Sequence, residues 1–568
     1  MFDEHIRIVM FSGISEFENE NSVHAAQYFE QRGHCELVTA GRVCYNGQGV
    51  SSWRADFRCL SMYFPTLFRM LRIRKEGSRA CLRKTSYLAL HLFRSDDRMY
   101  FQHLDPPRTH SSINMKTIIA SLMSLLLLAS FLPSVQAQQL PYGHSLLGSG
   151  SYDDFENPKS CASCHVDFAR QYEQAMMSQS YTHAWDEIEY FKLAVPHAMK
   201  DPNFDHAQQG CNGCHAPLAF IAGDVPPPKP YTGSRADEGV SCDVCHTITG
   251  SGENPPFNYS YFIQPGRVKY GNREGVISPH HETRKSEFTV SSELCATCHN
   301  EKNPFGIWVK STHLEWKEGP YSKEGVRCQD CHMPRGTARV SKMSPVQSEV
   351  PQHLFMGAHS PAKLLGAVEL SVWPDIRDVV PGESIVITVA AYNHKAGHYI
   401  PTGSVEERQL WLTVKAIDAN GREYHLPVDA KGFDGEEYTI SSNALAFQDI
   451  RYMLDEPDFK GLPRDALPYE GDRVFRMPFF DPEGRMTIAQ WNTASLGVDY
   501  RIGPRETKLE TYTWKLPVTI PLGTVRIVAE MHYRRLIESV GVYLGVPDEE
   551  MTPEFISRSE SSFTVVDY

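Results

Sequence analysis

The sequence predicts two dissimilar parts: a mainly helical, loop-rich part followed by an all-β C-terminal domain of the immunoglobulin-like sandwich type. A Cys-x-x-Cys-His pentapeptide occurs five times between residues 161 and 332 and nowhere else. Beyond about residue 363, runs of alternating apolar residues separated by turn residues take over. The composition, 41% hydrophobic and 22% charged over 568 residues, is typical of globular domains.

Charge and hydropathy exclude two classes of protein. The chain has 56 Lys and Arg against 69 Asp and Glu, a formal net charge of -13. Because binding to phosphate backbones needs basic patches, nucleic acid is not expected as a partner. One long apolar run, at residues 118–132, is too little for a polytopic membrane protein.

That apolar run has the features of a signal peptide. Lys116 precedes it and a series of small residues follows it. We interpret residues 115–137 as the signal peptide and Met115 as the start of translation, which makes residues 1–114 a spurious or disordered upstream extension. The alternative is a real upstream domain followed by a buried or anchoring helix. The product is expected to be periplasmic or extracellular, with no stable membrane anchor after cleavage.

The five pentapeptides carry the chemistry of the first part. In C-x-x-C-H, two cysteines on one turn form thioethers with a porphyrin, and the following histidine binds its iron as the proximal ligand. All ten cysteines after residue 137 fall in these motifs, and zinc ribbons would need two Cys pairs per metal, which an odd number of motifs does not supply. We therefore predict five covalently attached haem c groups. The attachment residues are Cys161, Cys164, Cys211, Cys214, Cys242, Cys245, Cys295, Cys298, Cys328 and Cys331, and the proximal ligands are His165, His215, His246, His299 and His332.

A six-coordinate haem needs a second axial ligand, usually His or Met. Eleven histidines outside the motifs lie between the predicted signal peptide and residue 400: His144, His183, His197, His206, His280, His281, His313, His353, His359, His394 and His398. The preferred distal ligands are His183, His281, His313, His353 and His359, with Met176, Met177 and Met333 as alternatives. An unfilled position would leave one iron five-coordinate, and catalysis would be expected there, with His197 or His206 as proton donors.

The segments around the motifs are also informative. They include residues 315–334 (EWKEGPYSKEGVRCQDCHMP), His281 followed by residues 293–299 (ELCATCH), and residues 353–359 (HLFMGAH). In these segments the chain resembles multihaem cytochromes of the cytochrome c-554/c-552 type. The resemblance implies a helical core with tightly stacked haems and a role in exported electron transfer. Related haem arrangements also occur in hydroxylamine and nitrite enzymes and in extracellular cytochrome filaments. No C-x-x-C-K motif is present, so the open lysine-ligated haem of pentahaem nitrite reductases has no counterpart.

The C-terminal part is predicted from alternating runs at residues 384–391, 410–417, 510–516 and 524–531, with a hairpin turn at residues 418–421 (DANG). Residues 392–411 are similar to a β-rich domain often attached to such cytochromes. His394, His398, Glu406, Glu407 and Arg408 cluster in this segment. A polar loop with capping and ion-pair roles, or with His398 reaching the haem part, is favoured over a metal or substrate site. The domain is predicted to cover the haems or to dock partners.

These observations predict a pentahaem cytochrome c domain at residues 138–362 and a β-sandwich at residues 363–568. The favoured function is an exported carrier that relays electrons between redox protein partners through closely packed, mostly bis-histidine haems. One alternative is a multihaem oxidoreductase that acts on a small inorganic nitrogen or sulfur compound at one five-coordinate haem. The other is an electron-conducting subunit of a larger complex or filament. Electron transfer is favoured over an enzymatic role.

Overall fold

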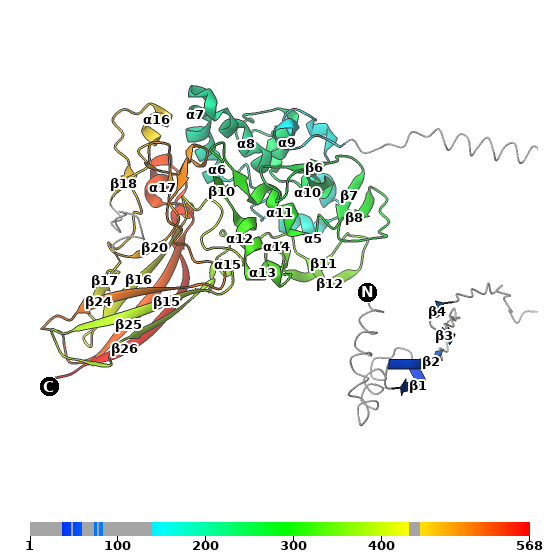
Figure 1. Ribbon diagram of the computed structural model, residues 1–568. Coiled ribbons are helices and arrows are strands. Elements are labelled where there is room, and N and C mark those ends of the chain that lie inside the picture. The colour runs from blue at the N-terminus through cyan, green and yellow to red at the C-terminus, as the bar shows by residue number, and fades with distance from the viewer. Residues whose placement is uncertain are drawn as a thin grey trace, which may run out of the picture. The chain divides into compact units, whose positions relative to one another are not determined.

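The computed structural model describes residues 139–430 and 444–567, together with four strands further upstream (Figure 1). These strands form two antiparallel hairpins: β1 (Leu37–Asn46) with β2 (Gly49–Cys59), and β3 (Ile73–Glu76) with β4 (Arg79–Leu82). They belong to a compact unit that ends at Leu126, and a second unit, from Leu127 to Tyr568, contains all features discussed below. The predicted signal peptide lies outside the described residues, so its assignment stays a prediction.

The first part of the second unit consists of short helices joined by loops, as the sequence predicts. The helices are α4 (Pro158–Ala162), α5 (Val166–Tyr172), α6 (Ala184–Glu189), α7 (Val195–Lys200), α8 (Asp205–His215), α9 (Pro217–Ala222), α10 (Cys242–Thr247), α11 (Ser292–His299), α12 (Thr312–Glu318), α13 (Pro320–Lys323), α14 (Cys328–His332) and α15 (Pro361–Leu364). Two-stranded sheets lie between them: β5 (Ile248–Ser251) with β6 (Tyr261–Ile263), β7 (Val268–Gly271) with β8 (Glu282–Lys285), β9 (Glu301–Lys302) with β10 (Trp308–Lys310), and β11 (Arg335–Arg339) with β12 (Val346–Pro351).

Each C-x-x-C-H motif coincides with a helical turn. Four motifs lie entirely within α8, α10, α11 and α14, and the first one runs from the end of α4 to the N-cap of α5. On a helix, residues three apart lie on the same face, so the two cysteines of a motif point to the same side. The local fold therefore suits attachment of both thiols to one group.

The C-terminal part contains two large sheets, besides two small ones: β18 (Leu445–Ala446) with β19 (Leu462–Pro463), and β22 (Met486–Thr487), β21 (Phe479–Phe480), β23 (Ser495–Leu496). One large sheet has the order β13 (Val368–Pro374), β15 (Ser384–Asn393), β24 (Thr507–Lys515). The other has the order β14 (Asp378–Val379), β26 (Glu554–Val565), β25 (Gly523–Arg534), β16 (Gln409–Ile417), β17 (Glu423–Leu426), with β20 (Arg473–Phe475) also paired to β16. The four predicted strands are confirmed as β15, β16, β24 and β25, and the predicted turn joins β16 to β17.

The two large sheets share one hydrophobic core. Alternate residues of β15, including Ile387 and Val389, pack in the same cluster as Leu412 of β16 and Ile527 of β25. Burying each such side chain stabilises the fold by about 1.5–3 kcal/mol, and the period of two sends every second residue into the core. The C-terminal part is thus strand-rich and layered, whereas its immunoglobulin-like type stays a prediction.

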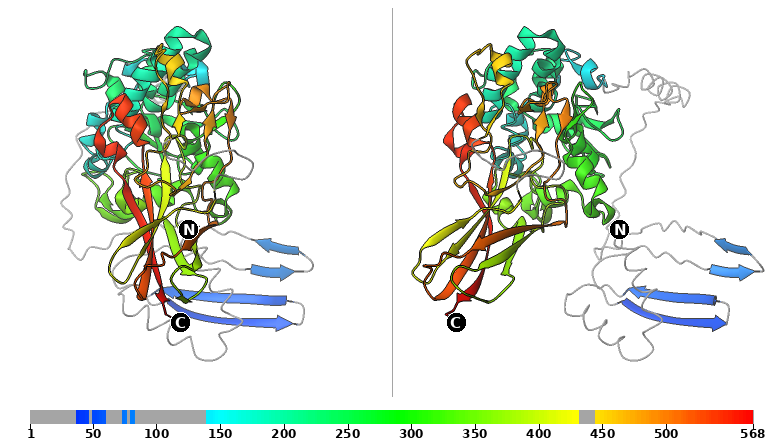
Figure 2. Two further views of the ribbon diagram at one scale, coloured as in Figure 1. Left: turned by 90° about the vertical axis from the view of Figure 1, so that its left-hand side faces the viewer. Right: turned by 60° about the vertical axis from the view of Figure 1, so that its left-hand side comes forward.

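A second core joins the helical part to the C-terminal part. Trp185 of α6 and Leu193 pack with Ile450, Leu536 and Val540. These last three residues belong to or adjoin α16 (Ile450–Leu454) and α17 (Glu538–Leu544). Figures 1 and 2 show α16 and α17 beside α6 and α7, while the two large sheets extend away from the helices. The predicted boundary near residue 363 therefore separates parts that are packed together. Among the described residues, no helix has the length and apolar character needed to cross a membrane.

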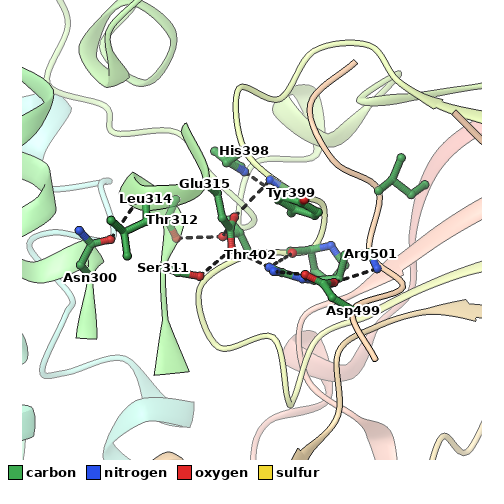
Figure 3. A network of polar contacts seen from close by, with 12 residues as sticks. Asn300, Ser311, Thr312, Leu314, Glu315, His398, Tyr399, Thr402, Asp499 and Arg501 are labelled. Carbon is green, nitrogen blue, oxygen red and sulfur yellow. Dashed lines mark hydrogen bonds and ion pairs between the residues drawn. The ribbon is translucent and has the colours of Figure 1, made fainter. Parts of the chain in front are cut away.

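A buried ion pair holds helix α12 against the C-terminal part (Figure 3). Arg501 donates through Nη1 to Oε1 of Glu315 at 2.7 Å and through Nη2 to Asp499 at 2.7 Å. The second oxygen of Glu315 accepts hydrogen bonds from the Thr402 hydroxyl at 2.7 Å and the Tyr399 amide at 3.2 Å. Glu315 thus fixes the loop that follows β15 onto the helical part.

Replacing Glu315 with alanine should lower the free energy of unfolding by about 3 kcal/mol, because Arg501 stays buried and retains only Asp499 as a counter-charge. Thermal unfolding of the purified protein would measure this as a lower Tm. The matched control is Glu324→Ala, which removes the exposed partner of Arg505 and should change Tm little. Equal losses in the two variants would contradict a structural role for the buried pair.

Candidate cofactor site

The fold brings the five motifs together. Cys161 lies beside Cys242, Cys214 beside Cys298, and Cys295 beside Cys328. Cys245 of the third motif also lies within electrostatic range of Cys298. The ten motif cysteines are half-buried, and none of them is in a disulfide. The first motif therefore lies next to the third. The fourth motif lies next to the second, the third and the fifth, so all five attachment turns are connected.

Four of the five proximal histidines are held in the tautomer that iron binding requires. In each, Nδ1 faces a backbone carbonyl, which can only accept, so Nδ1 carries the proton and Nε2 keeps its lone pair. The pairs are His165 with Val340 at 2.5 Å, His215 with Ser180 at 2.8 Å, His246 with Tyr270 at 2.7 Å, and His332 with Met356 at 2.5 Å. These carbonyls also fix the orientation of each ring.

Three proximal histidines face a second imidazole across a narrow gap. The ring pairs are His165–His281 (centroids 6.1 Å apart, planes at 27°), His246–His353 (6.2 Å, 25°) and His332–His398 (6.3 Å, 20°). A metal–imidazole bond is about 2 Å long and the ring centroid lies roughly 1 Å behind the nitrogen, so two axial imidazoles on one iron have centroids about 6 Å apart. Each gap therefore suits one iron atom.

His281 and His353 are among the five preferred distal residues, whereas His398 is a candidate outside that set. His398 comes from the loop that Glu315 holds, and its Nδ1 faces the Tyr399 carbonyl at 2.8 Å (Figure 3). Its partner, His332, lies in a different part of the fold and 66 positions earlier in the chain. The sequence signal for His398 was its place in the segment similar to the attached β-rich domain, which does not identify its partner.

His313 is the third preferred residue that the fold places near the motifs. Its side chain is 1% exposed, and its Nε2 has no hydrogen-bond partner among the described residues. Its Nδ1 lies 3.3 Å from the Asn300 amide nitrogen. Burial lowers the pKa of His313 to about 4, so the ring is neutral at physiological pH. The Asn300 amide donates to Nδ1, so the ring proton of His313 lies on Nε2 here, and Nε2 at the cavity wall would bind a metal ion once that proton moves to Nδ1.

The other two preferred residues, His183 and His359, point toward a carboxylate group. Both direct Nε2 to Glu550, and their ring centroids are only 4.8 Å apart at 80°. They cannot be the two axial ligands of one iron, although a distal role for either one stays a prediction. No ring of a described residue stands at an axial separation from His215 or His299, and the side chain of His206 lies outside the described residues.

The remaining candidates have other contacts. His144 contacts the Tyr259 hydroxyl, His280 pairs with Glu156, His394 pairs with Glu369, and His197 accepts a hydrogen bond from Trp491. Met176, Met177 and Met333 line the cavity described next.

A cavity of about 840 Å³ runs along the second, fourth and fifth motifs. His215, His299 and His332 line it, each with cysteines of its own motif. Part of its wall comes from the C-terminal part, including His398 and Arg408. The C-terminal part thus forms part of the cavity wall, and its role as a haem-covering module stays a prediction.

Buried carboxyl groups lie next to the second motif. Glu189, Glu406 and Glu407 are 9%, 5% and 0% exposed, and the oxygens of Glu406 and Glu407 accept no hydrogen bond from a described donor. Burial raises the pKa of Glu189 to about 7 and that of Glu406 to about 8, and it raises the pKa of Glu407 strongly. Lys310 lies within electrostatic range of Glu406 and of Cys211. The cluster at residues 394–408 therefore does not form one site. His394 pairs with Glu369, His398 faces His332, and Glu406 is buried near Lys310.

Comparisons with known proteins agree with this geometry. Residues 160–247 match the family model for cytochrome c554 and c-prime, and residues 268–366 match the N-terminal region of the NapC/NirT cytochrome c family. The fold is similar to a penta-heme cytochrome c552 from Thermochromatium tepidum, with 21% identity, a TM-score of 0.51, and coverage of 72% of this chain and 99% of that one. The sporulation control protein Spo0M of Bacillus subtilis also matches, with 12% identity over 36% of this chain and 51% of its own, but at a TM-score of 0.13 it carries no argument. No curated protein matches.

Five attachment motifs on helical turns, imidazole pairs spaced for iron, and two cytochrome family models define the class. The chain is a multihaem c-type cytochrome, and haem c is its cofactor.

Replacing His398 with alanine should convert one haem from low-spin to high-spin, because the imidazole opposite His332 is lost. Electron paramagnetic resonance and the optical spectrum of the oxidised holoprotein would show this, with the haem content per chain unchanged. His394→Ala, which removes an exposed histidine four residues earlier, should leave both spectra as they are. An unaltered spectrum in His398→Ala would exclude its axial role.

The buried carboxyls should make stability fall as pH rises. A group whose pKa is raised by folding stabilises the protein below its unfolded value, and that stabilisation is lost as pH increases through the folded value. For Glu406 the loss spans about pH 4.5 to 8. We expect Glu406→Gln to reduce the drop in Tm between pH 5 and pH 8.5 by about 2–4 °C. Parallel curves for the variant and the wild type would contradict a proton held on Glu406 in the folded state.

Proposed function

We propose that this protein relays electrons between redox protein partners through five haem c groups held mostly by histidine pairs. The observation that carries the proposal is the set of three imidazole pairs with nearly parallel planes and centroids 6.1–6.3 Å apart. Haem supplies one-electron redox chemistry, and axial ligation from both sides favours electron transfer over binding of substrate at iron. The chain supplies the spacing, the axial ligands and the burial that set the potentials.

The ligand set that we propose follows from the geometry. The ten motif cysteines attach the haems, and the five motif histidines are proximal ligands. His281, His353 and His398 are the distal partners of His165, His246 and His332. His313 serves one of the two remaining irons, since its Nε2 has no other described partner. The neighbouring motif cysteines support closely spaced haems.

We propose further that residues 115–137 direct export to the periplasm or the cell exterior. The net charge of -13 supports basic redox partners, which a negative surface would steer at a rate that depends on salt concentration. Residues 138–362 then form the cytochrome domain, and residues 363–568 an immunoglobulin-like sandwich that covers it.

One observation favours a second candidate function. The cavity that His215 lines contains the charged groups of Asp186 and Arg408. An iron on His215 with a free coordination position would suit an oxidoreductase that acts on a small nitrogen or sulfur compound. Arg408 would provide positive charge for an anionic substrate.

The two functions differ in the response to small ligands. The relay predicts five haems per chain in a haem assay and low-spin resonance signals that do not shift with nitrite, hydroxylamine or sulfite. A high-spin signal equivalent to one haem that shifts on addition would favour the oxidoreductase. A haem count other than five would overturn the cofactor assignment.

A further inference from the structure

Three side chains from distant parts of the chain converge beside the cofactor cavity, whose lining includes His359. His183 precedes α6, His359 lies in the loop before α15, and Glu550 belongs to α18 (Asp548–Met551). The Nε2 atoms of His183 and His359 lie 3.0 and 3.1 Å from the two carboxylate oxygens of Glu550. One ligand atom from each residue lies within 4.8 Å of the other two. His183 and Glu550 are buried, and His359 is half-buried.

The ring geometry differs from that of the axial pairs in an informative way. Imidazoles on opposite sides of one metal stand about 6 Å apart, as the three pairs above do. Imidazoles that occupy adjacent positions on one ion, at an angle of 90–110°, have centroids roughly 4.5–5.3 Å apart by the same bond lengths. The His183–His359 separation of 4.8 Å with planes at 80° falls in that second range.

Neighbouring groups hold these ligands in place. Asp186 accepts a hydrogen bond from Nδ1 of His183 at 3.0 Å. This bond orients the ring so that Nε2 points toward His359 and Glu550. Arg535 Nε lies 3.1 Å from Oε2 of Glu550 and anchors that carboxylate. A carboxylate behind a ligating histidine is the usual support of a protein metal site.

We propose that His183, His359 and Glu550 bind one divalent transition-metal ion, for which Zn²⁺ serves as the probe, separate from the haem irons. Two imidazoles and one carboxylate are a nitrogen and oxygen ligand set that zinc accepts. Binding replaces the two N–H···O hydrogen bonds to Glu550 with metal–ligand bonds. The Nε2 protons of both histidines leave to solvent. Nδ1 of His183 keeps its own proton, which it donates to Asp186 in a hydrogen bond. The ion would tie the start of α6, the loop before α15 and α18 to one point.

The test uses the purified holoprotein after treatment with a chelator and dialysis. Calorimetric titration with Zn²⁺ should show one site per chain, and elemental analysis of the loaded protein should give one zinc for five irons. Zn²⁺ should also raise Tm, because it binds only the folded arrangement. The optical spectrum of the haems should not change.

The variants His359→Ala and Glu550→Gln should each weaken zinc binding at least tenfold, whereas His394→Ala, at an exposed histidine, should bind as the wild type does. Absence of zinc binding in the wild type overturns the proposal, and so does binding that both variants retain. A high-spin haem in His359→Ala would assign this residue to a haem iron and equally overturn it. The proposal is independent of the electron relay, since a haem assay and zinc titration report on different groups.

Discussion

The proposed coordination of iron by an imidazole on each side is the constraint on which the rest of this structure depends. One imidazole follows the attachment cysteines directly, but the other must stand about 6 Å away, centroid to centroid, with a matching orientation. The three observed partners come from loops: His281 directly before β8, His353 after β12, and His398 after β15. The first part consists of short helical turns, small sheets and connecting loops, and loops also carry these three histidines.

The buried Glu315–Arg501 pair shows how the C-terminal part contributes to ligation. Glu315 lies on α12, which also carries His313, and its carboxylate holds the Tyr399–Thr402 loop that presents His398 (Figure 3). Two candidate ligands from different parts of the fold are thereby positioned by one network. The shared core of Trp185 with Leu536 and Val540 fixes the same two parts over a wider area. In the proposed ligand set, the C-terminal part would therefore both cover a haem and supply one of its ligands.

Buried carboxyl groups that do little to stabilise the fold are concentrated beside the second motif. Burying Glu406 and Glu407 without hydrogen-bond donors is unfavourable, and such groups persist in folded proteins mostly where function requires them. The ring geometry of His183 and His359 also differs from that of the three axial pairs. Three pairs stand on opposite sides of a gap suited to iron, whereas His183 and His359 meet at a carboxylate in perpendicular orientation. The same residue type therefore serves two geometries, and distance and angle distinguish them.

The sequence by itself determined what depends on neighbouring residues. Cysteines three apart followed by histidine identify the attachment turns, because a single helical turn brings them together. The alternation of residues 384–391 and 524–531 identifies strands for the same local reason, and DANG at 418–421 identifies the turn. Tertiary structure alone decided the pairing of His332 with His398 and the convergence of His183 and His359 on Glu550. Eleven histidines compete for these positions, and their assignment depends on separations of a few ångströms between segments tens to hundreds of residues apart. Chain composition and spacing do not encode such distances, since they result from how all the cores pack at once.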